Sequence, residues 1–516
     1  MIPLGARALT LREVAAVARA HDGLPGQESW PENRVTLAPP ARERMRESRA
    51  VVDAAVEGGH TVYGVTTGFG ELKDQAISRE DVRTLQVNLL RSHAAGVGPE
   101  APREVVRAML LLRAASLARG YSGARPEVVD TLLAFLDRGV TPVVPLQGSV
   151  GASGDLAPLA HLAGVLAGEG EAWLGDRRMP AALALRGAGL QPLVLEAKEG
   201  LALINGTQLS TALAVLACVD AWSVWEAGVA AAALTTEVLM GSFVPAREDV
   251  QALRPYRGAL ETARRLRAWS AESALAASHA ECERVQDAYS LRCVPQVMGA
   301  AYDALEHVTS QLEVEIDAVN DNPLVLAATD EVISAGLFHA EPVGMVADYL
   351  KVAVAEIAAL SERRIDRLLD HRVSGLPRVL ADDPGLESGY MLAQYTAAAL
   401  VSENKVLAHP ATVDSIPTGA GVEDHVSMAP IAGRHARAVV ENAARVVALE
   451  LLCACRALEF RRPVGAGLGS ERVYAAVRRL VPTPEGDRPL SGPCEIVAQW
   501  VLSGALERLA EEVLSE

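Results

Sequence analysis

The chain has 516 residues, with 48 lysines and arginines against 65 aspartates and glutamates, so its formal net charge is −17. Half of the residues are hydrophobic, which excludes a disordered chain, and 42 glycines and 28 prolines are too few for a collagen-like or low-complexity chain. The acidic balance argues against a nucleic-acid-binding protein, which normally has a basic surface.

The first 160 residues predict short elements separated by glycine-rich turns. Helical patterns at 10–20 and 41–57 flank a proline-containing stretch at 24–40. Glycine-rich turns follow at 63–70, 94–102 and 146–155. The N-terminus has charged residues every few positions and no apolar signal-peptide region, so no secretory leader is predicted.

The second half predicts long helices. Alanine, leucine and valine dominate runs with helical spacing and few breakers at 208–240, 281–318, 344–370, 385–407 and 430–460. The predicted fold is therefore mainly α: a long-helix bundle with a smaller mixed N-terminal part. We expect an N-terminal domain at 1–200 and the bundle with C-terminal helices at 201–516.

Two features predict a protein of a reducing cytoplasm that does not enter a membrane. The most apolar stretch, 211–244, is interrupted by Asp220, Glu226 and Glu237, which favours a buried helix over a membrane span. No pair of cysteines has the C-x-x-C spacing of a zinc or redox site. We expect six reduced packing residues: Cys218, Cys282, Cys293, Cys453, Cys455 and Cys494.

The densest glycine cluster is GSVGASGDLAPLAHLAG at 148–164. Gly151 and Gly154 permit backbone conformations that other residues avoid. Its residue types alone predict a tight turn before a helix, with Asp155 as the N-cap and Pro158 in the first turn.

The Ala152-Ser153-Gly154 triplet in this cluster resembles the signature of the aromatic amino acid ammonia-lyases. The resemblance covers nearly the whole chain, because eight motifs of that family occur in order: YGVTTGFG, LQVNLLRSHAAGVG, GSVGASGDLAPLAH, EGLALINGT, QDAYSLRCVPQ, NDNP, FHAEPV and EDHVSMAP. Eight ordered motifs are far more specific than any single match.

The resemblance implies that Ala152, Ser153 and Gly154 cyclise without another enzyme to 4-methylidene-imidazol-5-one (MIO). The nitrogen of Gly154 would attack the carbonyl of Ala152, and Gly154 has no side chain to obstruct the approach. Loss of water from Ser153 would leave a conjugated methylene, an electrophile that natural side chains do not supply. The mixed N-terminal part is thus expected to carry the MIO loop.

Two residues before this loop receive roles from the resemblance. Tyr63, which is otherwise a half-buried tyrosine beside a glycine turn, would be the general base that removes the β-proton, with its pKa lowered from about 10. His93 lies in the Ser92-His93 pair, where the family selects the substrate side chain. Ser-His is typical of histidine-specific members, and a histidine can hydrogen-bond an imidazole. Out of context His93 is a packed structural residue.

Further site residues follow the loop. Asn205, otherwise a helix cap, would bind the substrate carboxylate or orient the MIO carbonyl. Gln286, Tyr289 and Arg292 have i, i+3, i+6 spacing, which predicts one broad helical face that is commonly solvated. By resemblance the fork of Arg292 binds the substrate carboxylate, Gln286 and Tyr289 support the MIO and the amine, and Phe338 packs near the MIO.

Glu423 completes the expected site. Its position suits a helix-start carboxylate, but in histidine-specific members the matching glutamate binds the imidazole. Two departures from the family pattern lie nearby: Gly421-Val422 replace Asn-Gln, and Leu337 replaces an asparagine before Phe338. Both remove polar groups close to the expected substrate side chain.

The resemblance implies elimination of ammonia from L-histidine to give trans-urocanate, the first step of histidine breakdown. It also implies a homotetramer with shared active sites, with a small amino acid as the binding partner and neither nucleic acid nor membrane involved. No metal or nucleotide is indicated. Three alternatives stay open: a phenylalanine or tyrosine ammonia-lyase, an MIO-dependent 2,3-aminomutase, and a helical structural protein with an inactive site.

Overall fold

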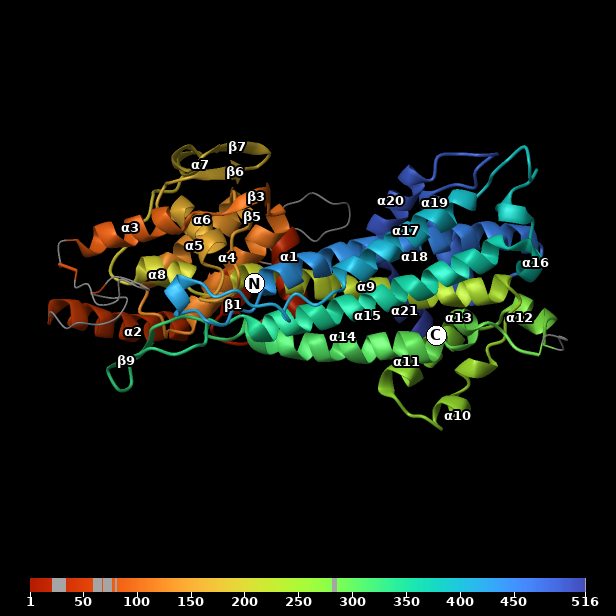
Figure 1. Cartoon of the computed structure of the whole chain (residues 1–516), viewed down its shortest axis with the longest axis horizontal. Helices are drawn as coiled ribbons and strands as arrows, with labels where there is room; N and C mark the ends of the chain where they lie inside the picture. Colours follow the sequence, from red (N-terminus) through yellow and green to blue (C-terminus); the bar gives the residue numbers. More distant parts are fainter. Residues whose placement is uncertain (21–33, 59–66, 68–76, 79–80, 281–284, 516) are drawn as a thin grey trace. The chain divides into compact units, whose positions relative to one another are not determined.

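The computed structural model describes residues 1–20, 34–58, 67, 77–78, 81–280 and 285–515. Helices dominate these residues, and strands are short (Figure 1). The prediction of a mainly α fold is confirmed. The chain forms two compact units: unit 1 contains Met1–Leu216, Thr309–Asp348 and Pro410–Arg434, and unit 2 contains Ala217–Val308, Tyr349–His409 and His435–Glu516. Whether the division expected at residue 200 separates independent domains stays a prediction.

Unit 1 combines short helices with small sheets. Strands β1 (Ile2–Leu4) and β2 (Val35–Leu37) pair in parallel; β3 (Val97–Glu100) pairs antiparallel with β5 (Pro145–Gln147). An antiparallel sheet has the order β4 (Val140–Pro142), β6 (Glu171–Leu174), β7 (Arg177–Pro180), and β8 (Leu324–Leu326) pairs with β9 (Glu331–Ile333). Its complete helices are α1 (Leu11–Arg19), α2 (Pro39–Glu57), α3 (Val82–His93), α4 (Arg103–Ala118), α5 (Pro126–Arg138), α6 (Leu156–Leu166), α7 (Ala181–Gly187) and α8 (Glu199–Ile204), with the short turn η4 (Gly419–Gly421).

Local sequence explains where helix α1 begins. Thr10 and Glu13 form a capping box at the start of α1, which satisfies two backbone N–H groups that lack partners in the first turn. Helix α4 is buried over nearly its whole length and packs against α1 and α5. Its two buried arginines, Arg107 and Arg113, donate to backbone carbonyls, which satisfies part of their hydrogen-bonding capacity inside the core.

Four long helices have residues in both units: α9 (Gln208–Val238), α14 (Val294–Ile316), α15 (Glu341–Leu369) and α18 (Ala429–Arg461). The other helices of unit 2 are α10 (Glu248–Gln251), α11 (Arg257–Trp269), α12 (Ala274–Ser278), α13 (Tyr289–Arg292), α16 (His371–Ser374), α17 (Met391–Leu407), α19 (Leu468–Leu480), α20 (Ser491–Leu502) and α21 (Ala505–Ser515), with the turns η2 (Val244–Ala246) and η3 (Arg378–Leu380).

The core of unit 2 joins apolar packing with one fully buried ion pair. Arg364 on α15 donates to Glu450 on α18 at 2.7 Å, and Thr235 and Ser361 also donate to that carboxylate. These hydrogen bonds compensate the burial of both charges, which is the condition for keeping an ion pair inside a helical core.

Two predicted runs differ from the structure. The run at 281–318 contains a break, because the short helix α13 ends before Pro295, which has no N–H to continue a helix and instead lies in the first turn of α14. The run at 385–407 becomes helical only from Met391, because Gly389 has φ +50° and interrupts the helical backbone.

Among the described residues, one helix, α9, is long and apolar enough to cross a membrane. However, 89% of its most apolar segment is buried inside the structure. That burial agrees with the predicted core helix. The five described cysteines form no disulfide with one another, and all but the half-buried Cys293 are buried, as expected of packing residues. Cys282 lies outside the described residues.

Candidate functional site

Three helices that carry or adjoin predicted site residues pack against one another in unit 1. Helix α3 ends at His93, α6 begins just after the Ala152-Ser153-Gly154 loop, and α8 ends just before Asn205. Each of these helices contacts the other two, and they lie together in Figure 1. The fold thus brings three distant segments of the sequence to one place.

The Ala152-Ser153-Gly154 loop has a tightly bent backbone. Gly151 and Gly154 have φ +69° and +73°, in the left-handed region that favours glycine. A Cβ on Gly154 would lie 2.2 Å from the carbonyl oxygen of Gly206, so no larger residue fits there. The expectation that Gly151 and Gly154 adopt backbone conformations that other residues avoid is confirmed, and the close approach of Gly206 is a second reason for glycine at 154.

Hydrogen bonds fix the loop on both sides. The N–H of Asp155 donates to Gly206 O at 2.6 Å, and the hydroxyl of Ser427 donates to Gly151 O at 3.0 Å. The N–H of Met428 donates to Val150 O at 2.8 Å. Because the partners belong to segments far apart in the chain, tertiary structure imposes the bend.

Asp155 stands at the N-cap position of α6, as predicted, but its side chain makes no capping bond to that helix. The buried carboxylate instead accepts hydrogen bonds from the backbone N–H of Ser210 at 2.8 Å and from the hydroxyls of Ser210 and Ser149. Burial raises the pKa of Asp155 to about 6, and these hydrogen bonds oppose the rise. Pro158 lies in the first turn, as predicted.

Glu423 reaches the same loop from a distant segment. The hydroxyl of Ser153 donates to Glu423 Oε1 at 2.6 Å, and the hydroxyl of Thr418 donates to Glu423 Oε2. Glu423 does not begin a helix, since α18 starts at Ala429, so its reading as a helix-start carboxylate is wrong. Glu423 therefore lies beside the Ala152-Ser153-Gly154 loop, while its expected contact with a substrate imidazole stays a prediction.

His93 is half-buried at the end of α3. Its Nδ1 lies 2.9 Å from the carbonyl oxygen of Leu89 and 3.0 Å from the hydroxyl of Ser92. Because the carbonyl can only accept, this arrangement favours a proton on Nδ1 with Nε2 as the acceptor. Burial lowers the pKa of His93, while the Leu89 carbonyl and the charge of Glu423 raise it. The lowered pKa favours the neutral form of the His93 imidazole.

Asn205 caps the end of α8, with its N–H donating to Leu201 O at 2.9 Å. Its backbone carbonyl accepts from the guanidinium of Arg113 at 2.7 Å, which holds the residue in place. Its side-chain oxygen is buried and has no hydrogen-bond partner among the described residues. An orphaned buried amide oxygen is costly, so it suits contact with a ligand.

Phe338 is half-buried in the turn before α15. The two residues that depart from the family pattern, Leu337 and Val422, are 53% and 67% exposed. Both apolar side chains thus face outward from the described chain, where they leave the Ser153–Glu423 contact undisturbed.

The predicted helical face of Gln286, Tyr289 and Arg292 is wrong. Gln286 precedes the four-residue helix α13, and Tyr289 and Arg292 are its first and last residues. The guanidinium of Arg292 lies over the ring of Tyr289, 4.7 Å from its centroid. These residues belong to unit 2, and the others named above belong to unit 1.

Arg292 also has a buried Nε without a hydrogen-bond partner among the described residues. Arg292 itself is half-buried, and Tyr289 beside it is 70% exposed. This combination suits an incoming anion such as a carboxylate. Tyr63 lies outside the described residues.

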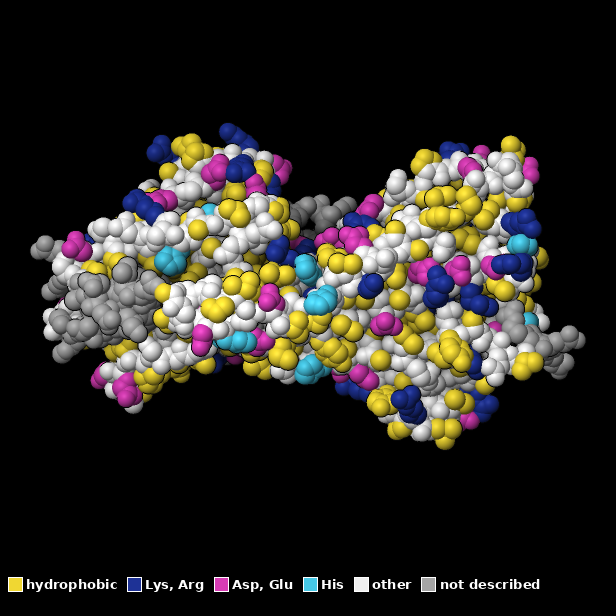
Figure 2. Space-filling model, in the orientation of Figure 1, with side chains coloured by type: hydrophobic (Ala, Val, Ile, Leu, Met, Phe, Trp, Pro, Cys, Tyr) yellow, Lys and Arg dark blue, Asp and Glu magenta, His cyan; other side chains and the backbone are white. Residues whose placement is uncertain are grey.

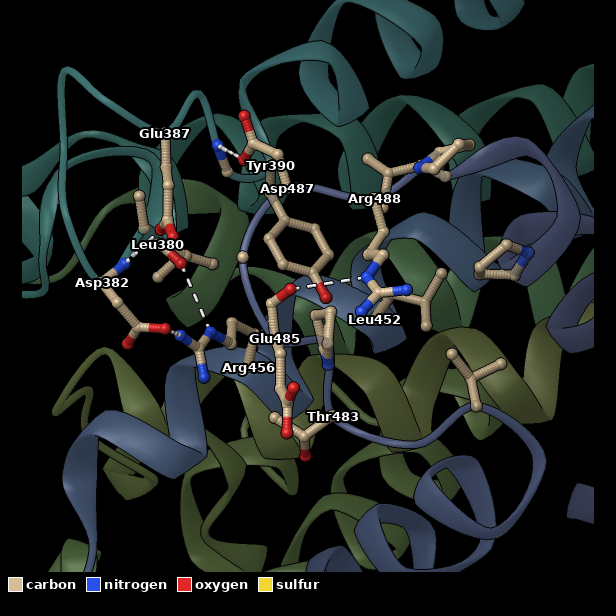
Figure 3. Close-up of a pocket in the computed structure, with 18 of the residues that line it drawn as sticks. Leu380, Asp382, Glu387, Tyr390, Leu452, Arg456, Thr483, Glu485, Asp487 and Arg488 are labelled. Atoms are coloured by element: carbon tan, nitrogen blue, oxygen red, sulfur yellow. Dashed lines mark hydrogen bonds and ion pairs between the residues drawn. The ribbon is translucent and has the colours of Figure 1, made fainter.

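A separate cavity of about 410 Å³ lies within unit 2, between the loop before α17 and the loop before α20 (Figure 3). Its charged groups already engage one another: Asp487 accepts from the backbone N–H groups of Ser388 and Gly389, and Arg456 pairs with Asp382 at 2.6 Å. None of the predicted site residues lines this cavity.

Sequence reasoning missed the residues that hold the site. Arg113, Thr418 and Ser427 each hydrogen-bond a predicted site residue or the loop, yet each looks ordinary in its local sequence. Only Asp155 stood out in the local sequence. It was predicted to cap α6, but its carboxylate accepts from Ser210 and Ser149 instead. Their roles depend on contacts between distant segments, which sequence spacing does not report.

Comparison with known proteins agrees with this geometry. The model of the family "Aromatic amino acid lyase" matches residues 9–479. A histidine ammonia-lyase of Gloeobacter violaceus is 52% identical over 504 residues, covering 98% of this chain and 96% of the relative. One of Bacillus subtilis is 46% identical over 506 residues, covering 98% and 97%.

Solved structures of related enzymes have the same fold as this chain. The crystal structure of histidine ammonia-lyase from Trypanosoma cruzi matches with a TM-score of 0.90 and 38% identity, over 99% of this chain and 95% of that one. Tyrosine aminomutase from Streptomyces globisporus matches with a TM-score of 0.91 and 35% identity, over 99% and 98%. The chain belongs to the aromatic amino acid lyase family.

Proposed function

We propose that this protein is a histidine ammonia-lyase, which eliminates ammonia from L-histidine to give trans-urocanate in the first step of histidine breakdown. The observation that carries the choice of substrate is the group formed by Ser153, Glu423 and His93. Glu423 accepts from Ser153 at 2.6 Å and lies within electrostatic range of a neutral His93. The identity of about half to histidine ammonia-lyases over nearly the full chain supports the same reaction.

Ala152, Ser153 and Gly154 are proposed to form the MIO group. The positive φ of Gly154 and the close approach of Gly206 give the bent backbone that such a ring requires. When formed, the group supplies an electrophile that makes the substrate amine a better leaving group. No metal or nucleotide has a part in this reaction as we propose it.

His93 and Glu423 are proposed to bind the substrate imidazole. The carboxylate accepts from a ring N–H, and cyclisation of Ser153 would remove the hydroxyl that now occupies Glu423 Oε1. A phenyl ring offers no such donor, and it would leave both protein groups without partners. This difference favours histidine over phenylalanine and tyrosine.

The remaining roles follow the family resemblance. Tyr63 would remove the β-proton, and a positioned general base contributes about 10²–10⁴-fold to rate. Asn205 would contact the substrate carboxylate or the MIO carbonyl through its unpartnered amide. Phe338 would exclude water, and Gln286 and Tyr289 would support the amine end.

Arg292 is proposed to bind the substrate carboxylate through its planar fork. Its buried Nε without a partner among the described residues supports this role. Tyr289 beside it is exposed, which supports a contact of this pair with a substrate or another subunit.

We propose that the protein assembles as a homotetramer whose active sites use residues from more than one subunit. Helix α17 has four large apolar side chains that are 38–71% exposed: Met391, Leu392, Tyr395 and Val406. Hydrophobic side chains are frequent on the face shown in Figure 2. Exposed apolar side chains along one helix favour burial against another subunit. Free cysteines suit a reducing cytoplasm as its location.

A 2,3-aminomutase is the second candidate, because a tyrosine aminomutase structure matches this fold at 35% identity. Such an enzyme would return ammonia to the β-carbon before the product leaves. Incubation with L-histidine distinguishes the two reactions. A lyase gives a rise in ultraviolet absorbance from urocanate with equimolar ammonia, whereas a mutase gives β-histidine without free ammonia.

The same assay tests the function as a whole. Purified protein is incubated separately with L-histidine, L-phenylalanine and L-tyrosine, and each conjugated product is followed by absorbance and mass. Faster reaction with phenylalanine or tyrosine would contradict the choice of substrate and leave the lyase class standing. No product from any of the three would contradict both.

A further inference from the structure

One histidine of the glycine-rich cluster at 148–164 has no role in the function proposed above. His161 lies in α6, the helix that begins just after the Ala152-Ser153-Gly154 loop, and it is half-buried. The backbone N–H of Gly96 donates to His161 Nε2 at 3.1 Å, although the two residues are 65 positions apart. This hydrogen bond connects the helix that follows the proposed MIO loop with the segment that follows His93.

The segment 94–96, directly after His93, has small side chains that cannot anchor it by packing. The two alanines are exposed, and Gly96 is half-buried. The N–H groups of the alanines donate to the carbonyls of Leu90 and His93, which are close by in the chain. The N–H of Gly96 donates instead to His161, on another helix. Of the three N–H groups in this segment, the one of Gly96 therefore fixes it to the rest of unit 1.

Close packing at Gly96 strengthens this connection. A Cβ on Gly96 would lie 3.1 Å from His161 Nε2 and 3.3 Å from the carbonyl oxygen of Gln147, and a Cβ on Gly148 would lie 3.0 Å from the Cα of Gly96. Strand β3, which follows Gly96, pairs with β5, which ends at Gln147. The backbone at Gly96 thus lies directly against His161 and the start of the glycine-rich cluster.

The hydrogen bond defines the chemical state of His161. Only an unprotonated nitrogen accepts from an N–H, so Nε2 has the lone pair and Nδ1 carries the proton. Burial lowers the pKa of His161, which favours this neutral form. His161 therefore acts as a hydrogen-bond acceptor. The side-chain oxygen of a glutamine could replace it at a similar reach, whereas the methyl end of a methionine could not.

We propose that His161 is a positioning residue for recognition of the substrate side chain, and that it acts through Gly96 on the segment that begins with His93. This role rests on the proposed function, in which His93 contacts the imidazole of L-histidine. Without the acceptor, the N–H of Gly96 loses its partner and the segment after His93 loses its connection to α6. The MIO loop should still form, because Gly206 and Ser427 hold it through separate hydrogen bonds.

The first test needs no substrate. Hydrogen exchange of the full-length protein is followed by mass spectrometry, with fragmentation that resolves the Gly96 amide. His161→Met removes the acceptor and keeps a side chain of similar length, and His161→Gln is the matched control that keeps an acceptor. The Gly96 amide should exchange at least about tenfold faster in His161→Met than in the wild type, and at about the wild-type rate in His161→Gln.

Steady-state kinetics with L-histidine measure the consequence for the substrate. KM should rise about three- to tenfold in His161→Met while kcat stays within about twofold, because a contact with the substrate side chain is weakened before and during the reaction alike. His161→Gln should restore KM to within about twofold of the wild type. Intact mass should show the same loss of water in all three proteins, which separates positioning from a failure to form the MIO group.

Circular dichroism confirms that each variant is folded, and His161→Leu takes the place of His161→Met if that variant does not fold. Unchanged exchange at Gly96 in the folded variant, or faster exchange with an unchanged KM, would overturn the proposal. An equal rise of KM in His161→Gln would also overturn it, because the acceptor would then be irrelevant. A wild type that does not convert L-histidine would contradict the proposed function together with this role, whereas an active wild type with an unaffected variant contradicts this role alone.

Discussion

Ser153 and Glu423 are 270 residues apart in sequence, yet the Ser153 hydroxyl donates to Glu423 Oε1 at 2.6 Å. This contact joins the loop expected to form the electrophile to the carboxylate expected to select the substrate. In the function proposed above, it would let one site combine the chemistry of ammonia loss with recognition of an imidazole.

Ser153→Ala should fold normally and lose almost all activity, because the scaffold is kept and the electrophile is not formed. Intact-mass spectrometry of the wild type should show a chain lighter than its sequence by two water molecules, and the variant should have its full sequence mass. A folded wild type with the unmodified mass would contradict formation of the MIO group.

Glu423→Gln should lower kcat/KM for L-histidine, because a neutral amide replaces the carboxylate that accepts from the ring N–H. A buried group left without its partner costs about 1–3 kcal/mol, and rejection of phenylalanine by the wild type should reach about 10³-fold. Steady-state kinetics with histidine, phenylalanine and tyrosine check both values. Unchanged histidine kinetics in the variant would remove Glu423 from the site.

Tyr63→Phe should keep the MIO group and the oligomer while kcat falls by about 10²–10⁴-fold, since the ring remains and the phenolic oxygen is lost. The measurement is kcat alongside intact mass and size-exclusion chromatography. A much smaller fall, with the prosthetic group intact, would assign proton removal to another residue.

Arg292→Lys should mainly raise KM, because a point charge replaces the planar fork that matches a carboxylate. Arg254, whose guanidinium also lies over a tyrosine ring in unit 2, provides a control as Arg254→Lys. The control should retain wild-type kinetics. Equal effects of the two substitutions would indicate a general loss of stability instead of a specific contact.

Asp155 predicts a pH dependence of stability. Its pKa is raised from 3.8 to about 6 by burial, so the folded state favours the protonated form. The stabilisation is fully present below about pH 4 and is lost as the pH rises through about 6, with a size on the order of 3 kcal/mol.

Asp155→Asn removes this titration. The melting temperature of the variant minus that of the wild type should therefore increase as the pH rises from about 4 to 6. This difference should be constant above about pH 7. Scanning fluorimetry of both proteins from pH 4 to 8 measures the difference. Parallel profiles across the whole range would show that Asp155 does not titrate in this interval.

The sequence by itself determined the helical class, the long runs that became α9, α15 and α18, and the family, because each is recorded in local composition or ordered motifs. It also predicted the left-handed backbone conformations of Gly151 and Gly154. It failed for Gln286, Tyr289 and Arg292, where periodicity suggested one helical face but helix α13 begins only at Tyr289, after Gln286.

Tertiary structure alone decided which groups support the site. The carboxylate of Asp155 accepts from Ser210 instead of capping its own helix, Arg113 holds Asn205, and Glu423 meets Ser153. Each contact joins segments that are distant in the chain. Sequence periodicity reports which face of a local element is apolar, whereas these partners are set by the packing of α3, α6 and α8 and by the path of the segment around Glu423.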